Sequence, residues 1–371
     1  MDPVALAQQL IAIDSVNPTL VPGSAGESAI ADFCAQWLER HGFEVERLER
    51  EPGRPSLVGI SRGTGGGASL MLSGHLDTVG ITTWPGDPFS GTVVNGRLVG
   101  RGAFDMKGGL AGLLVAAASA PERRGDVLVA LVADEEFGSR GTEDVLERYS
   151  ADAAIVAEPS QLEVTVAHRG FAWFRVDIDG LAAHGSMPEL GIDAIAHAGR
   201  IMRRLDELQS RLAARGAHPL LDPGTVRVST IAGGVDAATV APSCTLTIER
   251  RFLPGESPDA VEAELRSSLG ELLGERATLT RLVARGAFEA TADSSIRAVV
   301  REQLSAVTGS PAVERGEPFW TDAGLFAEAG IPTVLLGVVG GGAHADDEWA
   351  STESITQLTE VLRRTIAEFC A

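Results

Sequence analysis

DVLVALVADEE, residues 126–136, sets an unbroken apolar run directly before three consecutive acids. A short apolar run rich in valine and leucine is typical of a strand that is buried on both faces of a parallel sheet. Adjacent carboxylates repel one another, so Asp134, Glu135 and Glu136 need either open water or a cation at the end of this strand. The stretch therefore predicts an α/β protein with a polar site at the carboxyl edge of its sheet.

Three further apolar runs extend this pattern in both directions along the chain. They are SLMLSGHLD (69–77), AAIVAEP (153–159) and IPTVLLGVV (331–339), and the histidine-bearing GGAHADDEW follows the last of them. Between the strands predicted at 69–77 and 126–136 lies a segment rich in Gly, Ala and Leu, residues 105–120, which predicts a tightly packed helix. Strands that alternate with helices in this way are typical of βα units in an open sheet.

From about residue 171 the pattern changes to strands with alternating polar and apolar residues. FAWFRVDID, TVRVSTI, SCTLTIERRFL and ATLTRLV predict four such strands, and Ser257-Pro258 predicts the start of a helix that runs to about residue 273. With the helix predicted after residue 191, the order is β-α-β-β-α-β, a ferredoxin-like unit. We therefore expect a discontinuous catalytic domain, residues 1–170 and 286–371, that carries an inserted α+β domain at 171–285.

Charge and composition exclude several classes of protein. The chain has 31 basic and 51 acidic residues, a net charge of −20, which disfavours binding to nucleic acid or to an anionic membrane. The first residues, MDPVALAQQLIAID, lack the basic segment and apolar run of a targeting signal, and no stretch is long enough to span a bilayer. Three widely spaced cysteines indicate neither a disulfide framework nor a thiolate metal site, which favours a soluble cytoplasmic protein.

Histidine and acidic residues gather at the carboxyl ends of the predicted strands or in the loops that follow. They are His75, Asp77, Asp105, Glu135, Glu136, Glu158 and His344. Taken singly, His75 with Asp77 fits an ordinary surface pair, and Asp105 fits a helix N-cap. Taken together, imidazoles and carboxylates without thiolate form a ligand set for a hydrolytic pair of zinc, cobalt or manganese ions.

Seven motifs, in order along the whole chain, resemble those of a known family. They are GHLDTVG (74–80), GRGAFDMKGGLAG (100–112), DEEFGSRGT (134–142), EPS (158–160), GLAAHGSMPELGIDAI (180–195), ERRFLPGE (249–256) and GGGAHADDEW (340–349). The family is that of the co-catalytic zinc hydrolases, which includes acetylornithine deacetylase, succinyl-diaminopimelate desuccinylase, aminoacylase and carboxypeptidase G. The resemblance implies an open-sheet di-zinc catalytic domain with an inserted dimerisation, or lid, domain.

The resemblance also implies a division of the metal ligands. His75 and Glu158 would bind one zinc ion, and Glu136 and His344 would bind the other. Asp105 would bridge the two ions, and its peptide bond to the next residue would be cis, as in relatives. Cobalt or manganese would suit the same ligands.

Further roles follow from the same motifs. Asp77 would hydrogen-bond His75 and fix its tautomer, while Glu135 would be the general base that moves a proton from water to the leaving nitrogen. His184, in the insert, matches a histidine that in relatives reaches across a dimer to polarise the scissile carbonyl. The resemblance thus implies a homodimer formed through residues 171–285.

Substrate recognition is expected from both parts of the chain. Arg251 matches an arginine that binds the substrate carboxylate, whereas Arg250 is expected to be only a solvated charge on the opposite strand face. Thr321 and the glycine-rich loop that begins at Gly337 resemble substrate-contacting segments. In place of an asparagine common among relatives, this chain has Ala238 or Thr239, so the resemblance implies that an amide contact to substrate is missing here.

The predicted protein is a zinc-dependent amidohydrolase that removes an acyl group from the α-nitrogen of an amino acid. Its substrate would be a small N-acyl amino acid or a dipeptide-like amide. One alternative is a carboxypeptidase or dipeptidase with the same metals. Another is a non-catalytic dimeric scaffold, which a missing ligand or base would reveal, although none is missing.

Overall fold

A computed structural model describes residues 1–216 and 218–371. The chain divides into two compact units. The first comprises 1–166, 290–315 and 321–371, and the second comprises 167–289 and 316–320, so the insert expected at 171–285 lies inside the second unit. Among the described residues, no helix combines the length and the apolar character needed to cross a bilayer.

The main sheet has the strand order β1-β2-β6-β3-β7-β15-β8-β13, in which β13 is Phe288–Glu289, and β14 also pairs with β8. Its four central strands, β6, β3, β7 and β15, are parallel and correspond to the four predicted apolar runs. The strands are β1 (Glu44–Leu48), β2 (Ser56–Ser61), β3 (Leu70–His75), β6 (Val127–Val132), β7 (Ala153–Val156), β8 (Val164–His168), β14 (Glu314–Glu317) and β15 (Thr333–Leu335). The predicted α/β class is confirmed, because parallel strands buried on both faces form the core of the sheet.

Helices cover both faces of this sheet. They are α1 (Pro3–Ile11), α2 (Ser28–Arg40), α3 (Gly108–Ala118), α4 (Arg140–Leu146), α7 (Ser295–Thr308), α8 (Ala323–Glu328) and α9 (Thr352–Phe369). Gly59 of β2 faces Leu38 of α2, whereas Ser56, three residues earlier on the same strand, faces the start of α4. Residues an odd number apart on a strand point to opposite faces, so α2 and α4 lie on opposite sides of the sheet.

Helix α3 is buried on all sides, which explains its composition of Gly, Ala and Leu. A side chain at Gly109 would place its Cβ 2.3 Å from the carbonyl oxygen of Ala157, so glycine allows the helix to approach the end of β7. The helix is shorter than the predicted 105–120. It is preceded by an irregular turn, Ala103–Lys107, which carries Asp105.

A small sheet in the first unit joins two distant segments. It consists of β4 (Thr92–Val94), β5 (Arg97–Val99), β16 (Gly340–Gly341) and β17 (Trp349–Ser351), in the order β16-β17-β5-β4. Its central pair is antiparallel and sets Trp349 opposite Val99. The loop that carries His344 therefore lies beside the chain that leads to Asp105.

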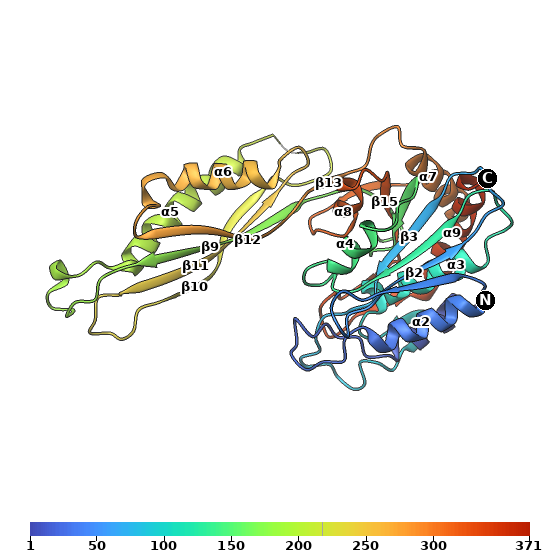
Figure 1. The fold of residues 1–371 in the computed structure, drawn as a ribbon, viewed down its shortest axis with the longest axis horizontal. Coiled ribbons are helices and arrows are strands. Elements are labelled where there is room, and N and C mark those ends of the chain that lie inside the picture. The colour runs from blue at the N-terminus through green and yellow to red at the C-terminus, as the bar shows by residue number, and fades with distance from the viewer. Residues whose placement is uncertain (217) are drawn as a thin grey trace. The chain divides into compact units, whose positions relative to one another are not determined.

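The second unit contains β9 (Gly170–Asp179), α5 (Ala194–Ala213), β10 (Thr225–Gly233), β11 (Ser243–Phe252), α6 (Pro258–Leu269) and β12 (Ala277–Arg285). Short 3-10 turns at Pro188–Leu190 and Gly270–Leu272 complete it. The sheet order β10-β11-β9-β12 and the two helices on one face are those of the predicted ferredoxin-like unit (Figure 1). The Ser257 hydroxyl caps α6 by accepting a hydrogen bond from Ala260 N, as the sequence predicted.

The prediction for Arg250 was wrong. Arg250 is 1% exposed, and its Nη2 donates to Glu256 (3.0 Å) and Glu264 (3.2 Å). On β11, Arg250 shares its face with Leu246, Ile248 and Phe252, and this face packs against the core of the unit. The alternation of apolar residues before Arg250 already placed it on the buried side, where a charge requires acidic partners.

Candidate metal centre

Parallel strands deliver the candidate ligands to one edge of the main sheet. His75 is the last residue of β3, while Glu135 and Glu136 follow β6 and Glu158 follows β7. Because β6, β3 and β7 are adjacent and parallel, their carboxyl ends meet. Asp105 reaches the same edge from the turn before α3.

Asp105 lies between the two histidines. Its Oδ1 is 3.0 Å from Nε2 of His75, and its Oδ2 is 3.5 Å from Nε2 of His344. Glu158 Oε1 lies 3.7 Å from His75 Nε2, and Glu136 Oε2 lies 3.0 Å from His344 Nε2. The two oxygens of one carboxylate thus face two separate His and Glu pairs, the arrangement of a bridging ligand. The Asp105–Met106 peptide is cis, as the resemblance implied.

The ring of His75 is oriented by the main chain of Asp77. Its Nδ1 lies 2.9 Å from the Asp77 carbonyl oxygen, while the Asp77 carboxylate is 3.7 Å away. A carbonyl oxygen only accepts hydrogen bonds, so Nδ1 donates to it, and Nε2 is the ring nitrogen that faces Asp105 and would bind a metal ion. The hydrogen bond that holds the ring therefore involves the Asp77 backbone, whereas the expectation was a bond to the Asp77 carboxylate.

The carboxylate of Asp77 instead holds the loop after β6. It accepts hydrogen bonds from the backbone N–H groups of Glu135 (3.1 Å) and Glu136 (3.2 Å). The side-chain amide of Asn17 donates to Asp77 Oδ2 (2.7 Å) and to Asp134 Oδ1 (3.2 Å). Asp77 therefore links the strand that ends in His75 to the loop that carries the two glutamates.

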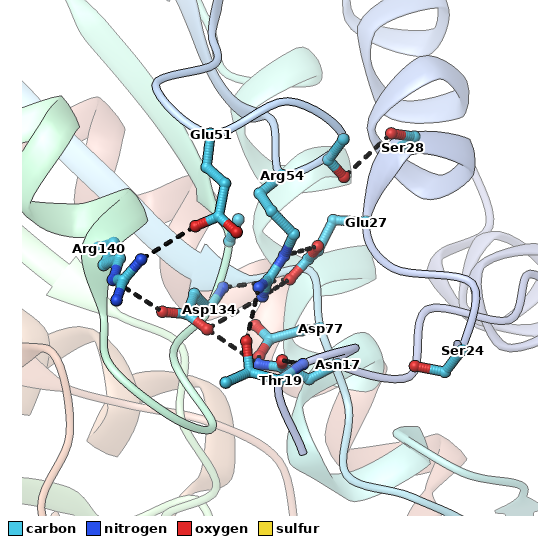
Figure 2. Close-up of polar contacts among 12 residues, drawn as sticks. Asn17, Thr19, Ser24, Glu27, Ser28, Glu51, Arg54, Asp77, Asp134 and Arg140 are labelled. Atoms are coloured by element: carbon cyan, nitrogen blue, oxygen red, sulfur yellow. Dashed lines mark hydrogen bonds and ion pairs between the residues drawn. The ribbon is translucent and has the colours of Figure 1, made fainter. Parts of the chain in front are cut away.

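A buried arginine supports this loop from behind. Figure 2 shows the Arg54 guanidinium between the carboxylates of Glu27 and Asp134. Arg54 donates to both oxygens of Glu27 at 2.6 Å and to Asp134 Oδ1 at 3.0 Å. Glu27 also accepts the backbone N–H of Asp134 (3.3 Å), a residue with φ of 68° in the left-handed region. These contacts fix the turn through which the chain leaves β6 and enters the site.

Charge in the cluster shifts its protonation. Burial lowers the pKa of His75, but the carboxylates of Glu158 and Asp105 outweigh burial and hold it well above its usual value. Hydrogen bonds to Asp105 and Glu136 raise the pKa of His344 to about 10. Burial, followed by the charge of Glu158, holds the pKa of Glu135 well above its usual range. The cluster thus retains protons that a bound divalent cation would replace.

The donor set fits a pair of divalent metal ions. In two groups of three residues, one ligand atom from each residue lies within 4.8 Å of the others. The first group is His75, Glu135 and Glu158, and the second is His75, Asp105 and Glu136. Among the described residues, Oε1 of Glu136 is a buried oxygen without a hydrogen-bond partner. Imidazole nitrogens and carboxylate oxygens are ligands that zinc, cobalt and manganese accept. His75, Glu158, Asp105, Glu136 and His344 would hold them.

Comparison with known proteins agrees with this chemistry. The sequence profile of Peptidase family M20/M25/M40 matches residues 71–368. The chain belongs to this family. It is 30% identical over 353 residues to an acetylornithine deacetylase from Myxococcus xanthus, with 92% of each chain covered. It is also 30% identical to an N-formyl-4-amino-5-aminomethyl-2-methylpyrimidine deformylase from Bacillus subtilis. That alignment spans 409 positions and covers 99% of this chain and 94% of the deformylase.

The structure of a dinuclear metal-binding M20 peptidase from Bacillus subtilis has the same fold. Its TM-score is 0.76 at 16% identity, with 99% of this chain and 97% of that chain covered. The resemblance seen in the motifs is confirmed, and this M20 protein is a metallopeptidase or amidohydrolase. The deacetylase and the deformylase act on different compounds by name, so family membership fixes the class of reaction and leaves the substrate open.

The remaining predicted residues of the M20 chain lie in both units. His184 is in a loop of the second unit and pairs with Thr239 across an isolated bridge. Its Nδ1 accepts the backbone N–H of Ser186 (3.2 Å), and Ser186 Oγ lies 2.8 Å away. An N–H group only donates, so Nδ1 is unprotonated and Nε2 carries the proton. His184 thus has a hydrogen-bond donor at Nε2.

Three residues were expected to contact substrate. Arg251, in the second unit, donates through Nε (3.2 Å) and Nη2 (3.0 Å) to Glu249 Oε1. Thr321 is buried in the first unit, where its hydroxyl accepts the N–H of Ala323 (3.3 Å). Gly337 is buried as well, and a Cβ there would lie 2.0 Å from the carbonyl oxygen of Glu158. Close packing against the segment that carries the candidate ligand Glu158 thus explains this glycine.

Sequence reasoning missed several polar residues near the M20 metal centre. Asn17, Arg54 and Glu348 are buried there, and so is Asp322, whose pKa burial raises to about 6. Asp322 accepts a hydrogen bond from the Thr142 hydroxyl (2.5 Å). No single local pattern marks these residues, because the partners that allow their burial are distant in sequence. Glu348, four residues after His344, was inside a recognised motif and was the most accessible to prediction.

Proposed function

We propose that the protein removes an acyl group from the α-nitrogen of an amino acid and that it does so with two zinc ions. The observation that carries the proposal is Asp105 between two His and Glu pairs, with Glu135 beside them. Bound metal ions would supply a hydroxide at neutral pH and polarise the scissile carbonyl. The protein would supply the geometry and the proton transfer.

Glu135 is the proposed general base. Its backbone N–H is fixed by Asp77, and it is adjacent to Glu136, which the proposal assigns to metal binding. Burial and the charge of Glu158 raise the pKa of Glu135, which brings a carboxylate closer to the pH at which it both takes and returns a proton. Glu135 would take a proton from the attacking water and deliver it to the leaving nitrogen.

Paired substitutions test this assignment. Glu135→Gln is expected to bind two metal ions per chain and to lose about 10²- to 10⁴-fold in kcat, because only proton transfer is removed. Glu136→Gln is the matched control at the neighbouring residue, and it is expected to lose one metal ion. Metal content by mass spectrometry and hydrolysis rates separate the two effects. Full activity of Glu135→Gln would exclude Glu135 as the base.

Arg251 is proposed to bind the carboxylate of the substrate. Glu249 occupies its Nε and Nη2, and the guanidinium lies near the Phe171 ring, 5.2 Å from its centroid. These contacts hold the side chain in place and direct Nη1 toward another acceptor. Arg251→Ala is expected to raise KM more than it lowers kcat for substrates with a free carboxylate.

A substrate panel tests the class of compound. It contains N-acetyl, N-succinyl and N-formyl amino acids, dipeptides and an N-formyl aminomethylpyrimidine, each with chelator and with zinc restored. Metal-dependent cleavage of acyl amino acids is the expected result. Cleavage of dipeptides alone would indicate the peptidase alternative. Cleavage of the pyrimidine alone would contradict carboxylate recognition by Arg251.

We also propose that the protein is a homodimer and that His184 acts in the partner's site. Strand β10 is an edge of its sheet, and the second unit exposes several large apolar side chains, as expected of an interface. They are Leu181, Leu190, Ile195, Ile231 and Val235. The Nε2–H of His184 would donate a hydrogen bond to the oxyanion.

Mixing two inactive variants tests this arrangement. A dimer of His184→Ala and Glu135→Gln chains would contain one site with both intact residues if His184 acts across the dimer. After denaturation and refolding together, about a quarter of wild-type activity is expected, because half the dimers are mixed and half their sites are intact. No recovery of activity in mixed dimers would place His184 and Glu135 of one site on one chain.

A further inference from the structure

The carboxylate of Glu348 organises the turn that carries Asp105. Its Oε2 accepts hydrogen bonds from Nη1 of Arg101 (2.7 Å) and from the backbone N–H of Gly102 (2.9 Å). Its Oε1 accepts the backbone N–H groups of Phe104 and Asp105, both at 2.9 Å. Glu348 is 1% exposed, so both carboxylate oxygens are fully engaged by donors from one short segment.

Glu348 also belongs to the segment that carries the other candidate ligand. It lies four residues after His344 and directly before β17, which pairs with β5. Its own carbonyl oxygen accepts the N–H of Gly100 (3.2 Å). Through backbone and side chain together, Glu348 joins the turn of Asp105 to the loop of His344.

We propose that Glu348 is a positioning residue for the metal pair and that it controls the ion bound by His344 more than the ion bound by His75. This inference rests on the proposed function, because it takes Asp105 and His344 as metal ligands. His75 is fixed independently as the end of β3 within the main sheet. His344 is 56% exposed in a loop, so its placement depends on what anchors that loop.

Glu348→Gln probes the carboxylate without a change of shape. Glutamine offers one acceptor oxygen and one donor group, so at least two of the four donors around it lose their acceptor. Outer contacts to metal ligands affect metal affinity by about 10- to 100-fold. We expect the second Co²⁺ ion to bind about 10- to 100-fold more weakly, while the first ion binds with nearly wild-type affinity.

The experiment is a titration of the metal-free full chain with Co²⁺, followed by visible absorption and by calorimetry. Asp152→Asn is the matched control, since Asp152 also accepts a backbone N–H, that of Ser69 (2.7 Å), and is not a candidate ligand. A purely structural role for Glu348 would lower the thermal stability of the metal-free protein and leave the ratio of the two affinities unchanged.

A second variant covers the case in which Glu348→Gln does not fold. Glu348→Asp keeps the charge but shortens the side chain, so a smaller loss of the second ion is expected. Two ions bound with wild-type affinities in the folded variant would overturn the inference. Failure of the wild-type chain to bind two ions would instead overturn the proposed function, so the two failures are distinguishable.

Discussion

Replacement of Arg54 by methionine tests the charge network behind the metal centre. The side chain of Arg54 is 8% exposed, and its partners Glu27 and Asp134 are 0% and 5% exposed. Methionine preserves much of the volume but leaves the Glu27 carboxylate without a cation and leaves Asp134 with only the exposed Arg140, whose Nε is 4.0 Å from Asp134 Oδ2 (Figure 2). Removal of one partner from a buried ion pair typically costs about 3–5 kcal/mol. We expect a loss of this size in the free energy of unfolding.

The assay is urea unfolding at pH 7 with chelator present, followed by far-UV circular dichroism. Arg50→Met is the matched control, because Arg50 also has two acidic partners but is 59% exposed, so water and salt screen its ion pairs and little loss of stability is expected. Glu27→Gln combined with Arg54→Met is expected to recover part of the loss by removing a buried charge. Equal losses for Arg54→Met and Arg50→Met would refute the reasoning.

Three further predictions concern other parts of the chain. Arg363 holds the pKa of Glu360 at about 2, so Glu360→Gln is expected to lower the free energy of unfolding by up to about 1 kcal/mol above pH 4.5. The difference between wild type and variant is expected to shrink as the pH falls toward 2, because Glu360 then becomes protonated in the folded protein. Urea unfolding at pH 7, 5 and 3 measures this difference, and a difference that does not change with pH would contradict the prediction. Gly337→Ala is expected to lower the free energy of unfolding by about 1–3 kcal/mol and to weaken metal binding, because the added Cβ would press on the carbonyl oxygen of Glu158. Urea unfolding and calorimetry with Zn²⁺ test this, and unchanged stability and binding would count against it. Burial raises the pKa of all three thiols, those of Cys34, Cys244 and Cys370. Ellman's reagent is therefore expected to label no thiol in the native protein at pH 8 and all three in urea, and rapid labelling of the native protein would disprove this.

The sequence was most informative where physical constraints are local. Apolar runs predicted the four parallel strands, because a strand buried on both faces admits few other residues. The positions of His75, Glu136 and Glu158 at the ends of these strands predicted that they would meet. Alternation and the cap at Ser257 predicted the order of elements in the inserted unit.

Prediction failed where burial depends on distant partners. Arg54 is 27 residues from Glu27 and 80 from Asp134, so no local pattern shows that all three share one buried site. Arg250 is a different case, because the alternation of apolar residues along its strand already indicated a buried position, and the expectation of a solvated charge did not follow that local pattern. The orientation of His75 by a carbonyl oxygen was also inaccessible, since backbone acceptors carry no sequence signature.

The position of β15 has a consequence for folding during synthesis. β15 lies between β7 and β8 in the main sheet, although it follows both of them by well over a hundred residues. The second unit is nearly continuous and is complete in sequence before β15 is made. Domains generally fold as units as the chain emerges, so the inserted unit is expected to fold while the main sheet still has an unfilled position between β7 and β8. That open sheet is the stage most exposed to aggregation.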